Sequence, residues 1–221
     1  MRPWGEIEAA AAARHGGGAA LEALLPTPAP KPQLLSVPDD RWLSTLSRMV
    51  FSAGFNWKVV EQKWPAFEEA FHGFEPGPCS MMDEEAVEIA AKAGGIPHMA
   101  KAMAARDNAV WFRHLAETHG TAARYFVDWP SERCADLLLA MKKEGGRLGG
   151  TTAQYFLRTM EVDGFMISND VGAGLVREGV VDRPPSSAKG LRAAQDAFNA
   201  WRAQSGRPLM QLSRILALSV E

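Results

Sequence analysis

The sequence predicts an all-α protein with roughly eight to ten helices. Apolar residues recur at spacings of three and four through most of the chain, as on one face of a helix. Gly and Pro clusters separate these periodic stretches, and no stretch sustains the alternation of a half-buried strand. We therefore expect helices joined by short turns.

The two ends of the chain differ in composition. Residues 1–36 are rich in Ala, Gly and Pro, which predicts an arm with a short helix at most and no catalytic scaffold. Residues 37–221 predict a helical domain. An alternative that composition leaves open is a pair of helical lobes with a cleft between them.

The first half of this domain predicts four helices. Asp39 or Asp40 caps a helix that ends at Gly54. A second runs from about Asn56 to Phe71, and Pro76 and Pro78 break the chain after it. The remaining two are expected over 82–93 and, after a Gly-Gly turn and Pro97, over 99–119.

The second half predicts five more helices. Ser131 caps one that ends at Gly145-Gly146, and the next runs from Thr151 to about Asp163. Asp170 is a natural cap for a helix to Gly179. The last two are expected from the Pro184–Ser187 run through Trp201 and from Pro208 through Leu218.

Composition excludes several classes of protein. A net charge of −2 argues against coating nucleic acid through bulk electrostatics, so any such binding must be local. No apolar run approaches the roughly 18 residues that a membrane span needs. Charged residues at Glu6, Glu8 and Arg14 interrupt the start where a signal peptide would be apolar. We expect a cytoplasmic monomer that does not bind membranes.

Cysteine and histidine usage predicts that the protein holds no metal and no other cofactor. Cys79 and Cys134 form no Cys-x-x-Cys pair, and the five histidines lack the helical spacing of a zinc site. Both thiols are expected to be buried or inert.

The most informative segment is the run Arg147–Ala153, in which a Gly-Gly turn opens a helix. Such a turn presents unpaired backbone N–H groups at a positive dipole end, which suits a phosphate oxygen. Basic residues lie near it, although a solvated helix face would carry them as readily. These basic residues are Lys142, Lys143 and Arg147, with Lys101 and Arg106 earlier in the chain.

The same segment carries a family resemblance. Leu148–Ala153, the apolar helix after it and Asp170 resemble the helix-hairpin-helix plus Asp signature of the endonuclease III superfamily of DNA glycosylases. Within that superfamily, an ordered set of motifs over about residues 40–180 resembles 3-methyladenine DNA glycosylase I. The motifs are Ser52–Trp57, Phe71–Phe74, Ala93–His98 with Lys101 and Asn108, and Gly150–Thr152 with Asn169-Asp170.

The resemblance implies a helix-hairpin-helix fold and a DNA glycosylase of base-excision repair. The protein would be associated with the nucleoid, and its substrate would be double-stranded DNA containing damaged bases, from which it removes alkylated purines such as 3-methyladenine. Asp170 would stabilise the sugar cation and orient the attacking water. The base pocket would be lined by Trp57, Met49, Phe55 and Asn56, and the DNA phosphates would bind Gly149, Gly150, Thr151, Thr152 and Lys101.

The sequence departs from this family at informative positions. Met49 stands eight residues before Trp57, where the family has its catalytic glutamate, and the family's zinc ligands are missing, with Val171 where a histidine would follow Asn-Asp. Thr151 occupies the position at which amine-dependent members carry lysine, which predicts hydrolysis without a Schiff base.

Plainer interpretations of the same residues stay open. Trp57 shares a helical face with Val60 and Trp64 and would suit a core position; Gly149-Gly150 would suit a tight packing turn; and Asp170 would suit a helix cap. At the level of the whole protein, the alternatives are a catalytically silent DNA-binding or lesion-recognition protein on the same fold and a helical protein without a nucleic-acid function.

Overall fold

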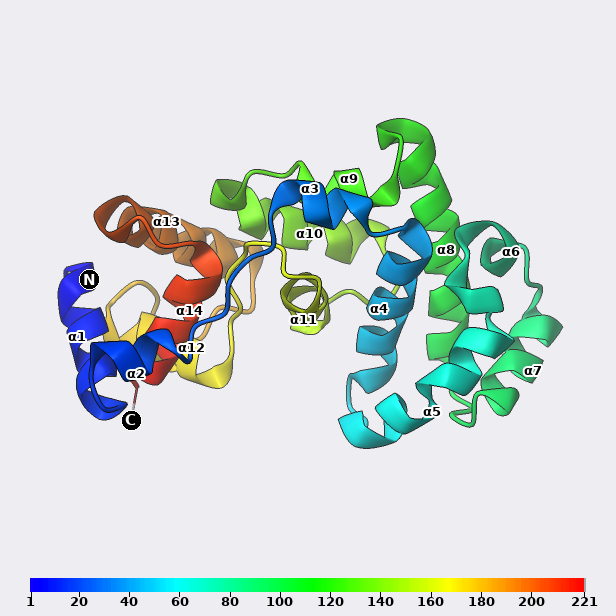
Figure 1. Ribbon diagram of the computed structural model, residues 1–221, viewed down its shortest axis with the longest axis horizontal. Helices are drawn as coiled ribbons and strands as arrows, with labels where there is room; N and C mark the ends of the chain where they lie inside the picture. The colour runs from blue at the N-terminus through cyan, green and yellow to red at the C-terminus, as the bar shows by residue number, and fades with distance from the viewer. Residues whose placement is uncertain (221) are drawn as a thin grey trace. The chain divides into compact units, whose positions relative to one another are not determined.

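The computed structural model describes residues 1–220 and is all-α, as predicted (Figure 1). It contains fourteen α-helices within these residues, of which ten have seven or more residues, and the described part of the chain forms no strand. The ten longer helices agree with the number expected from the periodicity. The short ones occur near Pro and Gly, where the sequence predicted turns.

The chain divides into two compact units. The central unit comprises Pro30–Asp128 and Ala140–Met160. The terminal unit comprises Met1–Ala29, Trp129–Leu139 and the chain from Glu161 onward. One helix, α10 (Cys134–Glu144), contributes residues to both.

The central unit is organised around its longest helix, α8 (Met99–His119), which packs against α4, α6, α7 and α9 (Figure 1). Buried aromatic rings fill the space between the helices; Trp42, for example, stacks on Phe126 with ring centroids 5.5 Å apart. The other elements of this unit are α3 (Lys31–Ser36), α4 (Asp39–Ser52), α5 (Trp57–Ala70), the 3-10 turn η1 (His72–Phe74), α6 (Pro76–Ser80), α7 (Glu84–Ala93), α9 (Ala122–Val127) and α11 (Thr152–Thr159).

Local sequence signals explain where α8 begins and ends. Pro97 precedes its first turn, and Gly120 ends it with a φ of +88°, a conformation that glycine adopts without steric cost. At the preceding turn, a Cβ on Gly94 would lie 2.7 Å from the ring of Phe67, so only glycine lets the chain pass this close to the core. Both ends of α8 coincide with the prediction.

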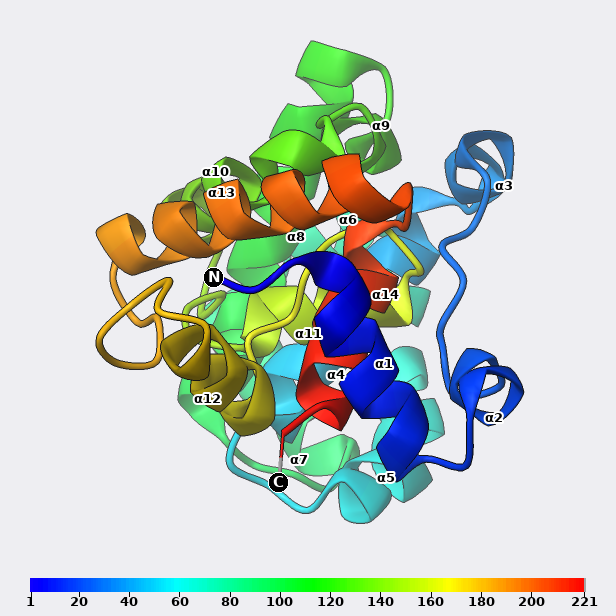
Figure 2. The same cartoon turned by 90° about the vertical axis from the view of Figure 1, so that its left-hand side faces the viewer.

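The terminal unit packs around α14 (Leu209–Leu218), which contacts α1, α12 and α13 (Figure 2). Phe198 and Trp201 on α13 are fully buried in its core, and the ring of Phe165 stacks on that of Phe198. The other elements of this unit are α1 (Trp4–Arg14), α2 (Gly18–Glu22), the 3-10 turn η2 (Ser131–Arg133), α12 (Asn169–Arg177) and α13 (Ala188–Ser205).

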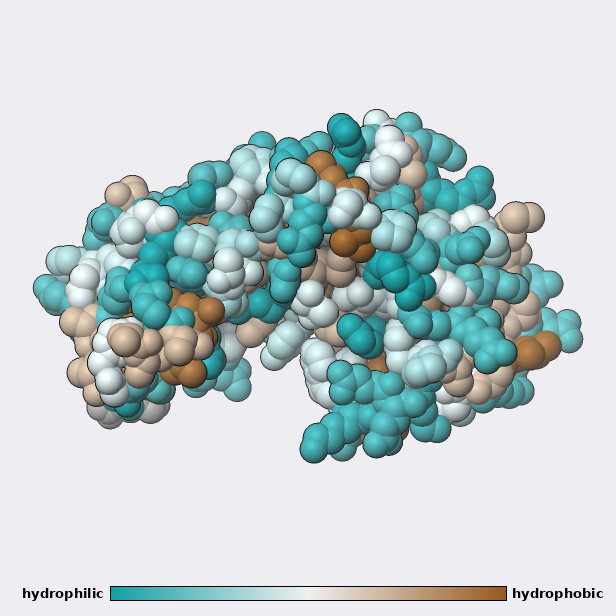
Figure 3. Space-filling model, in the orientation of Figure 1, coloured by the Kyte–Doolittle hydropathy of each residue, from teal (hydrophilic) through white to brown (hydrophobic). Residues whose placement is uncertain are grey.

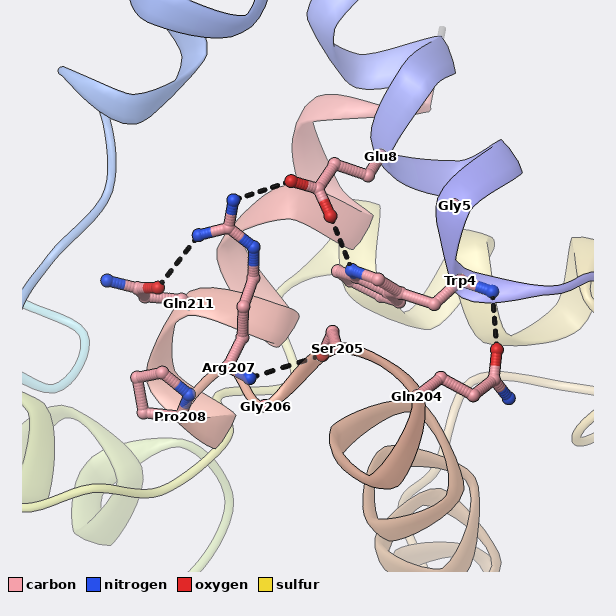
Figure 4. A pocket seen from close by; sticks show the side chains of 9 residues that line it. All are labelled: Trp4, Gly5, Glu8, Gln204, Ser205, Gly206, Arg207, Pro208 and Gln211. Carbon is pink, nitrogen blue, oxygen red and sulfur yellow. Dashed lines mark hydrogen bonds and ion pairs between the residues drawn. The ribbon is translucent and has the colours of Figure 1, made fainter.

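The N-terminal segment is more structured than the predicted arm. Its Ala-rich start forms α1, which places Trp4, Ile7 and Ala11 in the core of the terminal unit. Arg207 pairs with Glu8 of α1 at 2.5 Å (Figure 4). It also pairs with Glu22 of α2. Residues 1–29 are therefore an integral part of the terminal unit, because their apolar side chains cover α13 and α14.

The surface is mostly hydrophilic on the face shown in Figure 3, with apolar spots of limited size. Across residues 1–220, no helix combines the length and the apolar character that crossing a membrane requires.

A buried carboxylate ties the start of the chain to the end of α12. The side chain of Glu178 is 1% exposed, and it accepts hydrogen bonds from Arg2 (Nη2 to Oε1, 2.6 Å) and from Arg177 (Nε to Oε1, 2.9 Å). Arg177 also donates to the carbonyl of Ser219 at 2.6 Å. Burial raises the pKa of Glu178, but the hydrogen bonds from the two arginines outweigh it and lower the pKa to about 2.

This ion-pair cluster predicts a loss of stability in acid. Because the folded pKa lies below the ordinary value of 4.5, the stabilisation is present above pH 4.5 and is lost as the pH falls toward 2. This stabilisation amounts to about 3 kcal/mol.

Glu178→Gln should lower the free energy of unfolding at pH 7 by about this amount and flatten its dependence on pH below 4.5. Urea unfolding at pH 7 and pH 3 measures both effects. Asp196→Asn on the exposed face of α13 is the control, and an unchanged pH dependence in Glu178→Gln would contradict the prediction.

Candidate functional site

Residues 145–151 form a bend between α10 and α11. Hydrogen bonds to two residues of α8 hold this bend in place. The backbone N–H of Gly146 donates to Oδ1 of Asn108 at 2.7 Å, and Nδ2 of Asn108 donates to the carbonyl of Gly146 at 3.1 Å. One residue later, Nε of Arg147 donates to the carbonyl of Ala100 at 3.0 Å. The long central helix therefore fixes the position of the bend.

Glycines make this bend sterically possible. A Cβ on Gly145 would lie 2.3 Å from Cδ1 of Leu148, whose side chain is buried, and Gly150 has a φ of +61°. Arg147 also has a φ of +61°, which costs a non-glycine residue about 1 kcal/mol or more. Its hydrogen bond to Ala100 offsets part of this strain.

The bend leaves donors free at the start of α11. Within residues 1–220, the backbone N–H groups of Gly149, Gly150 and Thr151 donate no hydrogen bond, and Gly150 and Thr151 are exposed. Thr152 differs, because its N–H donates to the carbonyl of Gly149 at 3.3 Å and its side chain is mostly buried. Of the five residues predicted to hold phosphate, Gly149, Gly150 and Thr151 thus present free amides at the positive end of a helix.

Trp57 lies on the surface of the central unit, at the first position of α5. It is 46% exposed, whereas Val60 and Trp64 on the same helix are buried, so the interpretation of Trp57 as a core residue is wrong. Its ring meets that of Tyr155 on α11 edge to face, with centroids 5.2 Å apart. Two exposed aromatic rings from different helices therefore lie side by side.

The residues just before Trp57 shape the start of α5. Asn56 is the N-cap, with Oδ1 accepting a hydrogen bond from the backbone N–H of Lys58 at 3.0 Å. Phe55 is 40% exposed and meets the ring of His98 edge to face. In this structure the side-chain carbonyl of Asn56 is engaged in capping the helix that presents Trp57.

The structure does not show Lys101 as the exposed phosphate ligand that the sequence predicted. Its side chain is buried, and Nζ donates to the carbonyls of Phe51 at 2.9 Å and Ala53 at 2.5 Å, at the end of α4. The ammonium also lies 4.3 Å from the centre of the Phe55 ring. Burial lowers the pKa of Lys101, and the charge of Arg147 lowers it further. An ammonium held by these carbonyls is not free to reach a phosphate, so the expectation for Lys101 is corrected.

Met49 is nearly buried on α4. Its Sδ lies 3.8 Å from Oγ1 of Thr159, at the end of α11. Neither Thr159 nor Tyr155 was predicted from the sequence to belong to the site. The signal that points to them is their spacing of four residues on the helix that follows the bend, which puts both on one face.

Asp170 belongs to the terminal unit and is exposed in the first turn of α12. The predicted capping role is wrong, because Ser168 is the N-cap and its Oγ accepts from the N–H of Val171 at 3.2 Å. The Asp170 carboxylate lines an open hollow of about 490 Å³ together with Arg14, His15 and residues near the end of α14. It is therefore accessible from solvent and not sealed among packed helices.

No three His, Cys, Asp or Glu side chains gather as metal ligands among the described residues. Cys79 and Cys134 are both buried, and burial raises the pKa of each thiol to about 12. Neither thiol is poised to ionise as a ligand or nucleophile near pH 7.

Comparison with known protein families decides the assignment. A model of the methyladenine glycosylase family matches residues 36–166, more than half of the chain. The chain belongs to the methyladenine glycosylase family. It is accordingly a DNA glycosylase for alkylated bases. The matched segment includes Met49, Trp57 and the 145–151 bend, whereas Asp170 lies just beyond it.

Solved structures of two kinds of glycosylase share the fold of this family member. The 3-methyladenine DNA glycosylase I from Staphylococcus aureus is 18% identical over 64% of this chain and 82% of that one, with a TM-score of 0.51. The 8-oxoguanine DNA glycosylase from Methanocaldococcus jannaschii is 13% identical over 96% of this chain and 91% of that one, with a TM-score of 0.56. A comparison with curated protein sequences gave no significant match.

Proposed function

We propose that this protein is a monofunctional DNA glycosylase that hydrolyses the N-glycosidic bond of alkylated purines such as 3-methyladenine in double-stranded DNA. The observation that carries the proposal is the arrangement around α11. The residues that lead into this helix, Gly149–Thr151, have free amides, and Tyr155 of the helix contacts the exposed ring of Trp57. Groups suited to a phosphate and to a base are thus joined by one short helix.

Binding to DNA would depend on the bend. A base inside a duplex is out of reach of an active site, so the nucleotide must be extruded at a cost of a few kcal/mol. The N–H groups of Gly149, Gly150 and Thr151 would hold the backbone near the lesion, and the exposed Lys142 and Lys143 would add local positive charge. Trp57 would then stack on the flipped base, which is worth about 1–3 kcal/mol.

The chemistry that fits these residues is release of a cationic base. Alkylation at a ring nitrogen gives the base a positive charge, so it leaves with the bonding electron pair as a neutral molecule and needs no proton from the protein. Met49 cannot ionise and so cannot supply a proton to the base. A base that is already cationic does not need that proton. Asp170 would stabilise the sugar cation, orient the water that adds to C1′, and accept a proton from it.

The side chain at the start of α11 favours simple hydrolysis. Members that cleave through an amine need a lysine that attacks the sugar, whereas this chain has the hydroxyl of Thr151 at that position. We therefore expect an intact abasic site as the product, without strand cleavage.

One incubation with two readouts tests whether the protein releases the base and whether it does so by hydrolysis. Incubation with methylated duplex DNA should release 3-methyladenine, and borohydride should trap no covalent complex between protein and DNA. A trapped complex would contradict hydrolysis. Binding of methylated duplex with no release of base would instead support the catalytically silent DNA-binding protein.

A further inference from the structure

Two of the four residues predicted to line the base pocket, Trp57 and Met49, contact α11. Trp57 meets Tyr155 with ring centroids 5.2 Å apart and an angle of 63° between the ring planes. Sδ of Met49 lies 3.8 Å from Oγ1 of Thr159. Helix α11 also packs directly on α4, which carries Met49.

Tyr155 and Thr159 share one face of α11 because they are four residues apart. Both side chains are exposed, although the helix buries its opposite face, including Phe156 and Leu157, in the core of the central unit. The rings of Trp57 and Tyr155 pack on each other but stay outside the core, so they form one continuous exposed apolar surface, the kind of surface that marks binding sites. The face formed by Tyr155 and Thr159 is thus free to meet a ligand.

The start of α11 links this face to the bend. The backbone N–H of Tyr155 donates to the carbonyl of Thr151 at 2.9 Å, so the ring follows the free amides by one helical turn. A phosphate held at Gly149 and Gly150 would therefore set the position of Tyr155 relative to the bound nucleotide.

The chemistry of this face fits an alkylated purine. Aromatic rings attract a planar cation, and no carboxylate stands at Met49 to provide the charge. The hydroxyl of Thr159 donates and accepts hydrogen bonds, as the edge of a purine requires. Resting on the function proposed above, we infer that Tyr155 and Thr159 form a second wall of the base site and determine which lesion is accepted.

The test uses Tyr155→Ala, Tyr155→Phe and Thr159→Val, with Thr118→Val on the exposed end of α8 as the matched control. Single-turnover release of 3-methyladenine from methylated duplex is compared with release of hypoxanthine, a neutral base, from a duplex containing deoxyinosine. Tyr155→Ala should slow release of the cationic base by about 10-fold, and Tyr155→Phe should retain it because the ring is kept. Thr159→Val should change the ratio between the two bases, whereas Thr118→Val should not.

Two further measurements separate this inference from the proposed function. Affinity for a duplex with a tetrahydrofuran abasic site should stay within a few-fold of wild type in every variant, because the bend is intact. If the wild type releases no base, titration with free 3-methyladenine decides: Tyr155→Ala should bind it about 10-fold more weakly. Unchanged base release or base binding in Tyr155→Ala would overturn the inference, as would a wild type that neither releases nor binds the base.

Discussion

Asp170→Asn is expected to slow the release of 3-methyladenine from methylated duplex DNA by about 10²–10⁴-fold, the usual contribution of a well-placed acid or base. The carboxylate is exposed in the first turn of α12 and lines an open hollow, so it is accessible to a sugar and a water molecule. The amide is nearly the same size but cannot take the proton or balance the charge on the sugar. Single-turnover kinetics with excess protein measure the chemical step directly.

The control for this variant is Asp182→Asn, which removes an exposed carboxylate from the loop after α12. It should release base at the wild-type rate. Because Asp170→Asn removes a negative charge, its affinity for duplex DNA should equal or slightly exceed that of the wild type. Equal rates of release by Asp170→Asn and the wild type would eliminate the assigned role.

Strong local signals explain why much of the fold was predictable. The prediction of α8 matches at both ends because Pro97 and Gly120 leave little choice. The prediction of α11 extended about four residues too far, to Asp163, since no Gly or Pro marks its end. The chain leaves the helix where Glu161 adopts a φ of +59°, and Asp163 instead accepts a hydrogen bond from the backbone N–H of Met210 in the first turn of α14.

The candidate site was harder to predict because tertiary contacts decide it. Ser168 and Asp170 are equally good caps in sequence, and only the backbone path selects Ser168. Trp57 shares its helical stripe with buried residues, yet its position at the first residue of α5 leaves it exposed. The two hydrogen bonds between Asn108 and Gly146 join residues far apart in sequence, and no local pattern reveals them.

Lys101 is the most instructive failure, because lysine is rarely buried and a basic residue near a predicted phosphate site suggests a direct contact. In the structure its ammonium donates hydrogen bonds to two carbonyls at the end of α4 and lies over the ring of Phe55. We propose that Lys101 is a positioning residue, which holds the loop that presents Phe55 and Trp57. The two roles, positioning and phosphate binding, predict different responses to salt.

Lys101→Met keeps the aliphatic stem but removes the donor to Phe51 and Ala53, so the loop should shift and base release should slow by about 10²-fold, as misplacement by about 1 Å commonly does. The slope of log Kd against log salt should remain that of the wild type, because no phosphate contact is lost. Lys142→Met, at an exposed position near the bend, should instead reduce that slope by about 1 while leaving the rate at saturating protein almost unchanged.

Thermal unfolding of Lys101→Met provides the necessary check on folding. Loss of a hydrogen-bonded charge should cost about 1.5–3 kcal/mol and leave the protein folded at 25 °C. If the salt slope of Lys101→Met fell by about 1 as in Lys142→Met, the ammonium would contact phosphate in the complex, and the loop would have to open for it to do so. An unchanged slope with slow release separates the two roles, because only a positioning residue alters the chemical step without altering the number of ions displaced from DNA.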